Sequence, residues 1–185
     1  GVSVANALSE RMEVEVARDQ TLWTMAFERG KPKTKLIKAG KAPNRRGTKI
    51  RFRPDPQIFG EKAGFKAERV FKMARSKAYL FGGVEIRWHC DKALLKGNDD
   101  VPEKAVFHFA EGLKDYLAGG IAGATLVHPD IFTGTSGKVG RHGAAEWAVA
   151  WTVDQDGFLQ SYCNTIPTPD GGTHESGLRS ALLRG

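Results

Sequence analysis

Two neighbouring stretches near the start of the sequence alternate apolar and polar residues with a period of two. They are MEVEVA at residues 12–17 and LWTMAFE at residues 22–28, and a short polar stretch separates them. Because successive side chains of a strand point to opposite faces, this period predicts a half-buried β-hairpin. RGTKIRFRP at residues 46–54 returns to the alternation until Pro54 stops it. Residues 31–44, with two prolines and many lysines, predict a loop with at most one short strand at its middle.

Other segments of the sequence have the apolar spacing or the composition of helices. Small residues at 2–8 predict a short helix, and the apolar positions of residues 67–80 predict a longer one that Gly82 and Gly83 end. VEIRWHC at residues 84–90 is typical of a strand, and residues 91–102 form a polar connection. Residues 103–117 are interpreted as an amphipathic helix whose core contacts are Phe107, Leu113 and Leu117.

Beyond the glycine-rich residues 118–124, two strand patterns lie at residues 144–154 and 158–167. Gln155-Asp156-Gly157 separates them, and an Asp-Gly dipeptide is a strong hairpin signal. The last stretch, GGTHESGLRSALLRG, predicts a glycine turn into a helix with Thr173 as its N-cap. The chain is therefore expected to be an α+β protein with two domains, residues 1–120 and 121–185.

Composition limits the class of protein. With 185 residues and 41% hydrophobic content, the chain can bury one good core or two small ones. It contains neither the roughly 18 to 20 apolar residues of a membrane-spanning helix nor the layout of a secretory signal, so a cytoplasmic protein is expected. Cys90 and Cys163 lack metal-ligand spacing and predict buried, reduced thiols rather than a disulfide or a metal site. The first residue, Gly1, indicates a chain that begins inside a larger gene product.

Positive charge is concentrated in one segment. The net charge is +7, and residues 29–53 hold eleven Lys or Arg and no Asp or Glu. Such a density suits a polyanion, because each phosphate contact releases counterions. The alternative interpretation is a solvated hairpin with long cationic side chains.

Three stretches carry a resemblance to the ATPase subunit of bacterial type II DNA topoisomerases. GVSVANALS at residues 1–9 resembles the end of the ATP lid and the helix that follows it, which begins near Asn6. RRGTKIRFRPDPQIF at residues 45–59 resembles the glycine-threonine strand, and NTIPTPDGGTHESGLRSAL at residues 164–182 resembles the most specific signature, that of the second domain. Their order and spacing extend the resemblance over the whole chain. SKAYLFGGVEIRW and SYCNTIPTPDGG are more similar to the B subunit of the topoisomerase IV branch than to the gyrase B subunit.

The resemblance implies a fold and a nucleotide site. Residues 1–120 would be the C-terminal part of a gyrase-type (GHKL) ATPase α/β sandwich, and residues 121–185 the first part of a ribosomal-protein-S5-like transducer domain. Gly1 would be the last glycine of the lid, with Val2 and Ser3 at the phosphates and the pocket wall. Thr48 would read the adenine edge through a water, beside Ile50 on the apolar wall. Without the resemblance, Gly1 is a helix cap and Thr48 an ordinary strand residue.

The second-domain positions divide into structural and DNA-facing ones. Thr173 and His174 are interpreted as parts of a turn that the preceding glycines permit, because His174 has no acid or nucleophile at a recognisable spacing. In the family, Arg179 and Arg184 would border the cavity through which the transported DNA passes and attract its phosphates without reading bases. A solvated helix face is the equal alternative for both.

The resemblance also says what this chain does not contain. In the family, the glutamate base and the magnesium-holding asparagine lie before the lid, and the lysine that reaches the γ-phosphate would lie beyond residue 185. We therefore expect no catalytic residue and no metal ligand here. The 185 residues alone should neither hydrolyse ATP nor bind it tightly, although the full subunit would use ATP and Mg²⁺. Alternatively, the sequence is only the ordered part of a longer polypeptide.

The expected function is that of the full-length protein: ATP-dependent strand passage, decatenation and relaxation of DNA in the bacterial cytoplasm, associated with the nucleoid. The implied partners are DNA, a second copy of the ATPase region and the DNA-cleaving A subunit, with no membrane. Three alternatives stay open at this point. They are the gyrase B subunit, a non-enzymatic basic nucleic-acid-binding module, and a mismatch-repair or chaperone relative of the same ATPase superfamily.

Overall fold

The computed structural model describes residues 1–185 except residues 63, 98–99, 138–142, 155 and 185. It divides into two compact units, Gly1–Phe65 and Lys66–Gly185. The boundary expected between residues 120 and 121 falls inside the second unit, and its role as a domain boundary stays a prediction. Each unit is described by itself.

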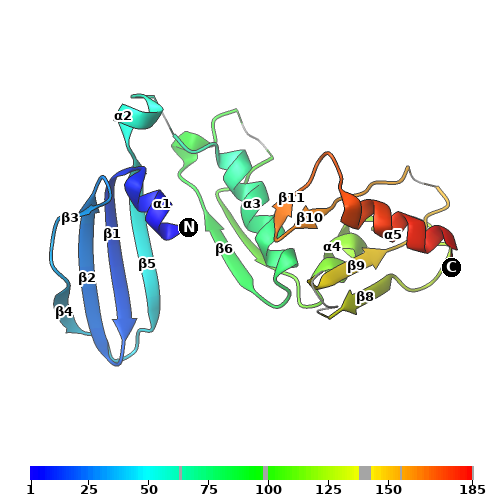
Figure 1. Cartoon of the computed structure of the whole chain (residues 1–185), viewed down its shortest axis with the longest axis horizontal. Helices are drawn as coiled ribbons and strands as arrows, with labels where there is room; N and C mark the ends of the chain where they lie inside the picture. The colour runs from blue at the N-terminus through cyan, green and yellow to red at the C-terminus, as the bar shows by residue number, and fades with distance from the viewer. Residues whose placement is uncertain (63, 98–99, 138–142, 155, 185) are drawn as a thin grey trace. The chain divides into compact units, whose positions relative to one another are not determined.

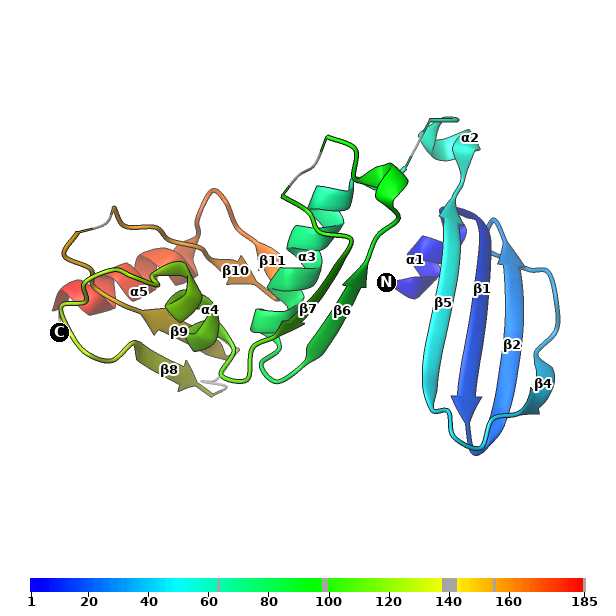
Figure 2. The same ribbon diagram turned by 180° about the vertical axis from the view of Figure 1, so that it is seen from behind.

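The first unit is one antiparallel sheet with a short helix at its start (Figures 1 and 2). Its central strand is paired on both sides, and the two shortest strands share the outer side of the second long strand. The elements are α1 (Val2–Ala7), β1 (Ser9–Arg18), β2 (Thr21–Glu28), β3 (Lys31–Pro32), β4 (Ile37–Lys41), β5 (Gly47–Pro54) and α2 (Pro56–Phe59). The predicted short helix, hairpin and third long strand are confirmed, and the predicted loop at residues 31–44 contains two short strands rather than one.

The strand register sorts the side chains of this sheet by polarity. Met12 lies opposite Phe27 on one side and Phe52 on the other, so these three residues share a face. Continuing the register by two places adds Val14 and Ile50 to the same face, while the opposite face mixes Arg, Lys and Glu side chains with Leu, Thr and Ala. Met12 is buried, but Ile50 is 41% exposed and Phe52 43% exposed. The sheet therefore has one apolar face that is only partly covered within this unit.

In its described part, the second unit combines three α-helices and one 3-10 helix with three separate two-stranded sheets. Its elements are α3 (Ala67–Leu80), β6 (Glu85–His89), the 3-10 helix η1 (Lys92–Leu94), β7 (Lys104–His108), α4 (Leu113–Gly120), β8 (Phe132–Ser136), β9 (Ala145–Val149), β10 (Tyr162–Cys163), β11 (Ile166–Pro167) and α5 (Thr173–Arg184). Helix α3 packs on the β6–β7 hairpin, where the ring of Phe71 meets Trp88 at 5.4 Å and Phe107 at 5.0 Å. These edge-to-face contacts form the aromatic part of its core.

The predicted helix at residues 103–117 is wrong in its first half. Residues Lys104–His108 form β7, which pairs with β6 from Glu85↔His108 to His89↔Lys104. An isolated β6 would leave its backbone groups without partners, and β7 satisfies them. Phe107 is a core residue as expected, but it reaches the core from a strand. The helix begins only at Leu113, after Glu111 donates its backbone N–H to the Asp115 carboxylate.

Three further expectations for the second unit are corrected. Strand β9 pairs with β8, and not with residues 158–167, so the hairpin expected at Asp156 and Gly157 does not join those two patterns; Gln155 lies outside the described residues. Helix α5 already includes Thr173, and the carbonyl of Gly172 accepts the Ser176 amide at the position expected of a cap. Cys90 and Cys163 are both free, but Cys163 is exposed.

The mixed α+β fold class is confirmed by these elements. No helix in the described part of the chain is both long enough and apolar enough to cross a membrane.

Candidate functional site

The start of the chain forms a helix N-terminus with free amides. Gly1 is the N-cap of α1, and its carbonyl accepts hydrogen bonds from the amides of Val4 and Ala5 at 3.1 and 3.2 Å. Within the described ranges, the amides of Val2 and Ser3 have no acceptor, as is usual for a first helical turn. A Cβ at Gly1 would meet no atom within 4 Å, so packing in this unit does not require glycine there. An anion could approach this backbone closely.

Thr48 and Ile50 lie on the open apolar face of β5. Thr48 is opposite Val16 and Ile50 is opposite Val14 across the β1–β5 pairing, and both are exposed. The local chemistry is an aliphatic surface with one hydroxyl that can donate and accept, which suits a flat heteroaromatic ring with polar edges. Both views of the chain show α1 running beside β5 (Figures 1 and 2).

These positions are compatible with parts of a nucleotide. The free amides beside Gly1 suit phosphate oxygens, and the face at Thr48 and Ile50 suits a base. Among the residues that the structure describes, no three His, Cys, Asp or Glu side chains gather to hold a metal ion.

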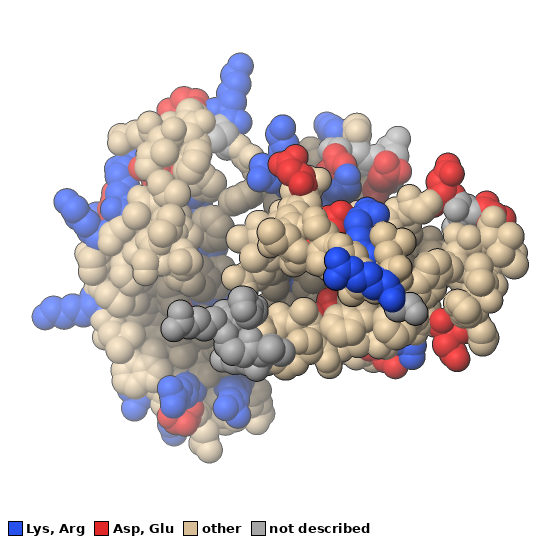
Figure 3. Space-filling view, turned by 45° about the vertical axis from the view of Figure 1, so that its right-hand side comes forward, with Lys and Arg blue, Asp and Glu red and all other residues tan. Residues whose placement is uncertain are grey.

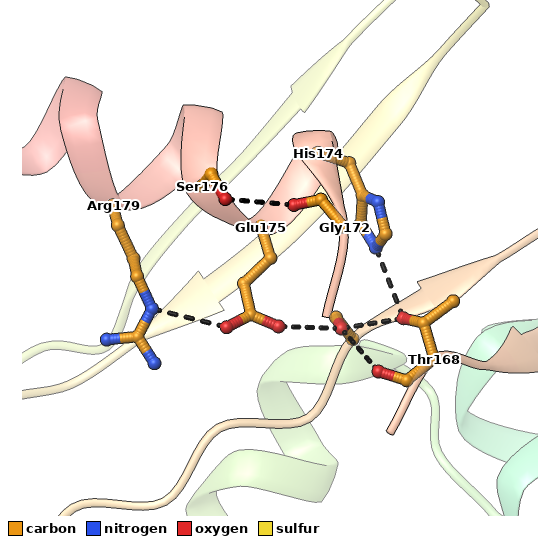
Figure 4. Close-up of polar contacts among 7 residues, drawn as sticks. Thr168, Gly172, His174, Glu175, Ser176 and Arg179 are labelled. Atoms are coloured by element: carbon orange, nitrogen blue, oxygen red, sulfur yellow. Dashed lines mark hydrogen bonds and ion pairs between the residues drawn. The ribbon is translucent and has the colours of Figure 1, made fainter. Parts of the chain in front are cut away.

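The glycine-glycine-threonine-histidine turn of the second unit is held by a network of side-chain hydrogen bonds (Figure 4). Nε2 of His174 lies 3.3 Å from the hydroxyl of Thr168, and Ser161 donates to the Glu175 carboxylate at 3.0 Å. The hydroxyls of Ser161 and Thr168 are 2.7 Å apart. Among the described residues, His174 bonds to Thr168 and not to Ser161, so His174 is not placed as a base for that serine. The arrangement fixes the turn into α5, in agreement with the structural role expected for His174.

The two arginines expected to face DNA both lie on α5 but differ in their partners. Arg179 is paired with Glu175 across one helical turn, its Nε 3.2 Å from the carboxylate (Figure 4). Arg184 is exposed and has no ion pair in the described part of the chain. The charge of Arg179 is therefore partly neutralised locally, whereas the charge of Arg184 is available to an outside anion.

A cluster of tyrosines in the second unit was not expected from the sequence. Tyr79 on α3 is buried, stacks on Tyr116 with ring centroids 3.8 Å apart, and shares a short hydrogen bond with the hydroxyl of Tyr162. Gln160 accepts from the hydroxyls of both Tyr116 and Tyr162, at 3.0 and 3.1 Å. Burial, followed by the bond to Tyr162, raises the pKa of Tyr79. The sequence carries no signal for this cluster, because its members come from three distant segments.

Comparison with known proteins points to one family. A family model described as DNA gyrase B matches residues 112–185. The sequence is 55% identical over 185 residues to the B subunit of DNA topoisomerase 4 from Bartonella bacilliformis, and 52% identical over 190 residues to the protein of the same name from Caulobacter vibrioides. Each alignment covers 100% of this chain and 27% of the relative, so the chain spans about a quarter of the length of these relatives.

Solved structures agree with the sequence relatives. The 43K ATPase domain of Thermus thermophilus gyrase B, solved in complex with an aminocoumarin, matches with a TM-score of 0.79 and 31% identity over 98% of this chain and 47% of that chain. The B-subunit of the DNA gyrase from Myxococcus xanthus matches with a TM-score of 0.78 over 98% of this chain and 50% of that chain, and at 22% identity it shows the fold alone. Over the stretch that it spans, the chain belongs to the family of bacterial type II DNA topoisomerase B subunits.

Proposed function

We propose that this chain is part of the ATP-driven machinery of a topoisomerase IV B subunit, which passes one DNA duplex through another and thereby decatenates and relaxes DNA. The observation that carries the proposal is the 55% and 52% identity, over all of this chain, to two proteins named as the B subunit of DNA topoisomerase 4. The likeness to gyrase ATPase structures supports the nucleotide-driven part of the proposal. The gyrase B subunit is the second candidate.

In this proposal, the start of the chain and β5 hold the ATP. The free backbone amides beside Gly1, which are those of Val2 and Ser3, face the phosphates. Ile50 lines the base, and Thr48 reads the edge of the base through a water. The support is the glycine cap, the unpaired amides and the exposed hydroxyl on an apolar face. In the full-length protein, Mg²⁺ accompanies the nucleotide and offsets the phosphate charge.

The proposed partners are DNA, a second copy of the ATPase region and a DNA-cleaving A subunit. Arg184, and Arg179 to a smaller degree, attract DNA phosphates without reading bases, because strand passage must ignore sequence. The expected location is the bacterial cytoplasm, with the nucleoid as the site of action.

The reaction type is tested with the intact protein and its DNA-cleaving partner. Linked DNA circles should be separated only when ATP is present, and relaxed circles should not become negatively supercoiled. Negative supercoiling would move the assignment to gyrase. DNA binding without any ATP hydrolysis would favour a non-enzymatic nucleic-acid-binding module.

The nucleotide site is tested by removing the hydroxyl of Thr48. In the intact protein, Thr48→Val should raise the KM for ATP about tenfold with little change in kcat, because one hydrogen bond to the bound ligand is lost. Thr24→Val is the matched control, since Thr24 lies on the opposite face of the same sheet. Equal effects of both substitutions would argue against a base-reading role for Thr48.

The isolated 185-residue chain provides a further test. In the family, the general base and the magnesium ligand precede the lid, so this polypeptide should show no ATPase activity and only weak ATP binding. Detectable hydrolysis by the purified chain would contradict the proposal that these residues hold only part of the site.

A further inference from the structure

Four lysines of the first unit lie in its edge strands β3 and β4 or in the segment between them. We call Lys31, Lys35, Lys38 and Lys41 the lysine edge. All four are exposed, and none of them forms an ion pair with a residue that the structure describes. Other cations of the same basic segment are paired: Lys33 with Glu28, and Arg45 with Glu15. The nearby carboxylates therefore neutralise some cations of the segment and leave these four lysines without an ion pair among the described residues.

The pairing of β2 sets the length of this row. Lys31 lies opposite Glu28 at one end of β2, Lys38 lies opposite Trp23, and Lys41 lies opposite Thr21 at the other end. Strand β2 has eight residues, which corresponds to about 25 Å at the usual rise of a strand. Lys and Arg side chains project from the left-hand edge of this unit in Figure 3. The register puts Lys31 on one face of the sheet and Lys38 and Lys41 on the other, so the cations are spread along both sides of this edge and do not converge on a point.

A linear row of cations suits a linear polyanion better than a small anion. A compact ligand such as a single phosphate group needs donors that converge on it. Duplex DNA carries one charge for about every 1.7 Å of its axis, so a row of this length can meet several phosphates at once. The same edge also carries outward backbone groups of β3 and β4, which can donate to phosphate oxygens as many DNA-binding proteins do.

We propose that the lysine edge is a sequence-independent binding site for the backbone of duplex DNA, on the unit that carries Thr48 and Ile50. The choice of DNA among polyanions rests on the proposed function, whereas the row of free charge does not. Binding at this edge adds affinity that depends on salt and does not depend on nucleotide.

Protection of the sheet edge is the competing explanation for these lysines. Charged side chains, prolines and bulges on an edge strand prevent pairing with other chains. This edge also has Pro32 in β3 and a register shift between Leu22 and Trp23 opposite β4. The edge is therefore already interrupted twice without the four lysines.

The test measures duplex DNA affinity of the intact protein against salt concentration without nucleotide. The variant K31Q/K35Q/K38Q/K41Q should bind at least about tenfold more weakly at low salt, and its log–log salt slope should fall by about 0.9 for each phosphate that the lysines no longer neutralise. The matched control is K62Q/K66Q/K96Q/K104Q, which removes the same charge from exposed lysines elsewhere. The all-arginine variant K31R/K35R/K38R/K41R should keep the affinity.

The outcomes separate this inference from the proposed function. Equal losses in the glutamine variant and its control, or no loss in either, would overturn the lysine edge as a DNA site. Unchanged affinity with self-association of the glutamine variant would assign these lysines to edge protection instead. If the wild-type protein neither bound DNA nor changed the topology of DNA, that result would contradict the proposed function itself, whatever the variants did. Thermal unfolding of every variant checks that the fold is retained.

Discussion

Arg29 donates a hydrogen bond of 2.7 Å from its Nε to the carboxylate of Asp55, and so joins the turn after β2 to the cap of α2. Asp55 is 2% exposed, and its second oxygen accepts the backbone amide of Gln57 at 2.9 Å. The bond from Arg29 is the main cause that lowers the pKa of Asp55 from its ordinary value, and the Gln57 amide adds to it. A charged Asp55 is therefore part of the folded state.

The first prediction concerns the loss of this charge. A carboxylate whose folded pKa is depressed stabilises the fold above its unfolded pKa, and this stability is lost as the pH falls through the folded value. Asp55→Asn should lower the free energy of unfolding at neutral pH. Because the variant has no carboxyl group at this position, its free energy of unfolding should also fall less steeply than that of the wild type below about pH 4. Urea unfolding at several pH values measures both effects.

The control for Asp55 is Glu13→Gln, which breaks the exposed pair between Arg11 and Glu13. Solvent screens such surface pairs, so this substitution should change the free energy of unfolding only a little. If Asp55→Asn behaved like Glu13→Gln, the cap of α2 would not depend on the charge of Asp55.

The second prediction concerns the turn between β10 and β11. Asn164 and Thr165 both have positive φ, of 48° and 68°, as a two-residue hairpin turn requires. A β-branched residue is strained in this conformation. Lys77 on α3 donates to both the carbonyl and the hydroxyl of Thr165 at 2.7 Å, and so holds the turn.

Lys77→Met should therefore lower the free energy of unfolding by about 1.5–3 kcal/mol, the usual contribution of hydrogen bonds to a charged group. In the Lys77→Met background, Thr165→Gly should then raise the stability by up to about 1 kcal/mol, because the strain is relieved and no bond to Lys77 remains to be lost. Lys72→Met is the control, since the hydrogen bond of Lys72 in the described part of the chain goes to the neighbouring exposed Glu68. Further destabilisation by Thr165→Gly would show that Thr165 is not strained.

The sequence predicted those parts of the fold that depend on a local period. The hairpin at Met12 and the helix from Ala67 to Leu80 follow directly from alternation and from helical spacing. Strand β7 was missed because Phe107, Leu113 and Leu117 also fit a helical stripe, and only the pairing with β6 decides between the two. Strand β8 was missed because FTGTS has almost no apolar content; its partner β9 defines it.

The residues of the candidate site also differ in whether a local sequence pattern predicts them. Gly1, Thr48 and Ile50 were singled out only by resemblance, since a capping glycine and a strand threonine are ordinary by themselves. The free side chains of the lysine edge could be suspected from charge density, but their lack of partners depends on where Glu15 and Glu28 lie. The tyrosine cluster had no local signal at all.

The third prediction concerns the close approach of Gly134 and Trp147. These residues face each other across β8 and β9, and a Cβ built on Gly134 would overlap the indole ring. Gly134→Ala should therefore displace Trp147 and lower the free energy of unfolding by about 1–3 kcal/mol, as overpacking usually does. Near-ultraviolet circular dichroism reports the movement of the ring. Gly137→Ala is the control, because a Cβ at Gly137 meets no atom of the described residues within 4 Å. Equal stability of the two variants would contradict the close packing.

The fourth prediction concerns the buried hydroxyl of Tyr79. Burial is the main cause that raises its pKa above the ordinary value of 10.0, and the hydrogen bond with Tyr162 acts in the same direction. A raised folded pKa stabilises the fold fully below the unfolded pKa, and this stability is lost as the pH rises beyond it. In an absorbance titration of the folded chain, one tyrosine equivalent should therefore ionise only together with alkaline unfolding. Tyr79→Phe should remove the tyrosine that ionises only on unfolding, and Tyr116→Phe should keep it. If such a tyrosine were still observed in Tyr79→Phe, the protected hydroxyl would belong to another tyrosine.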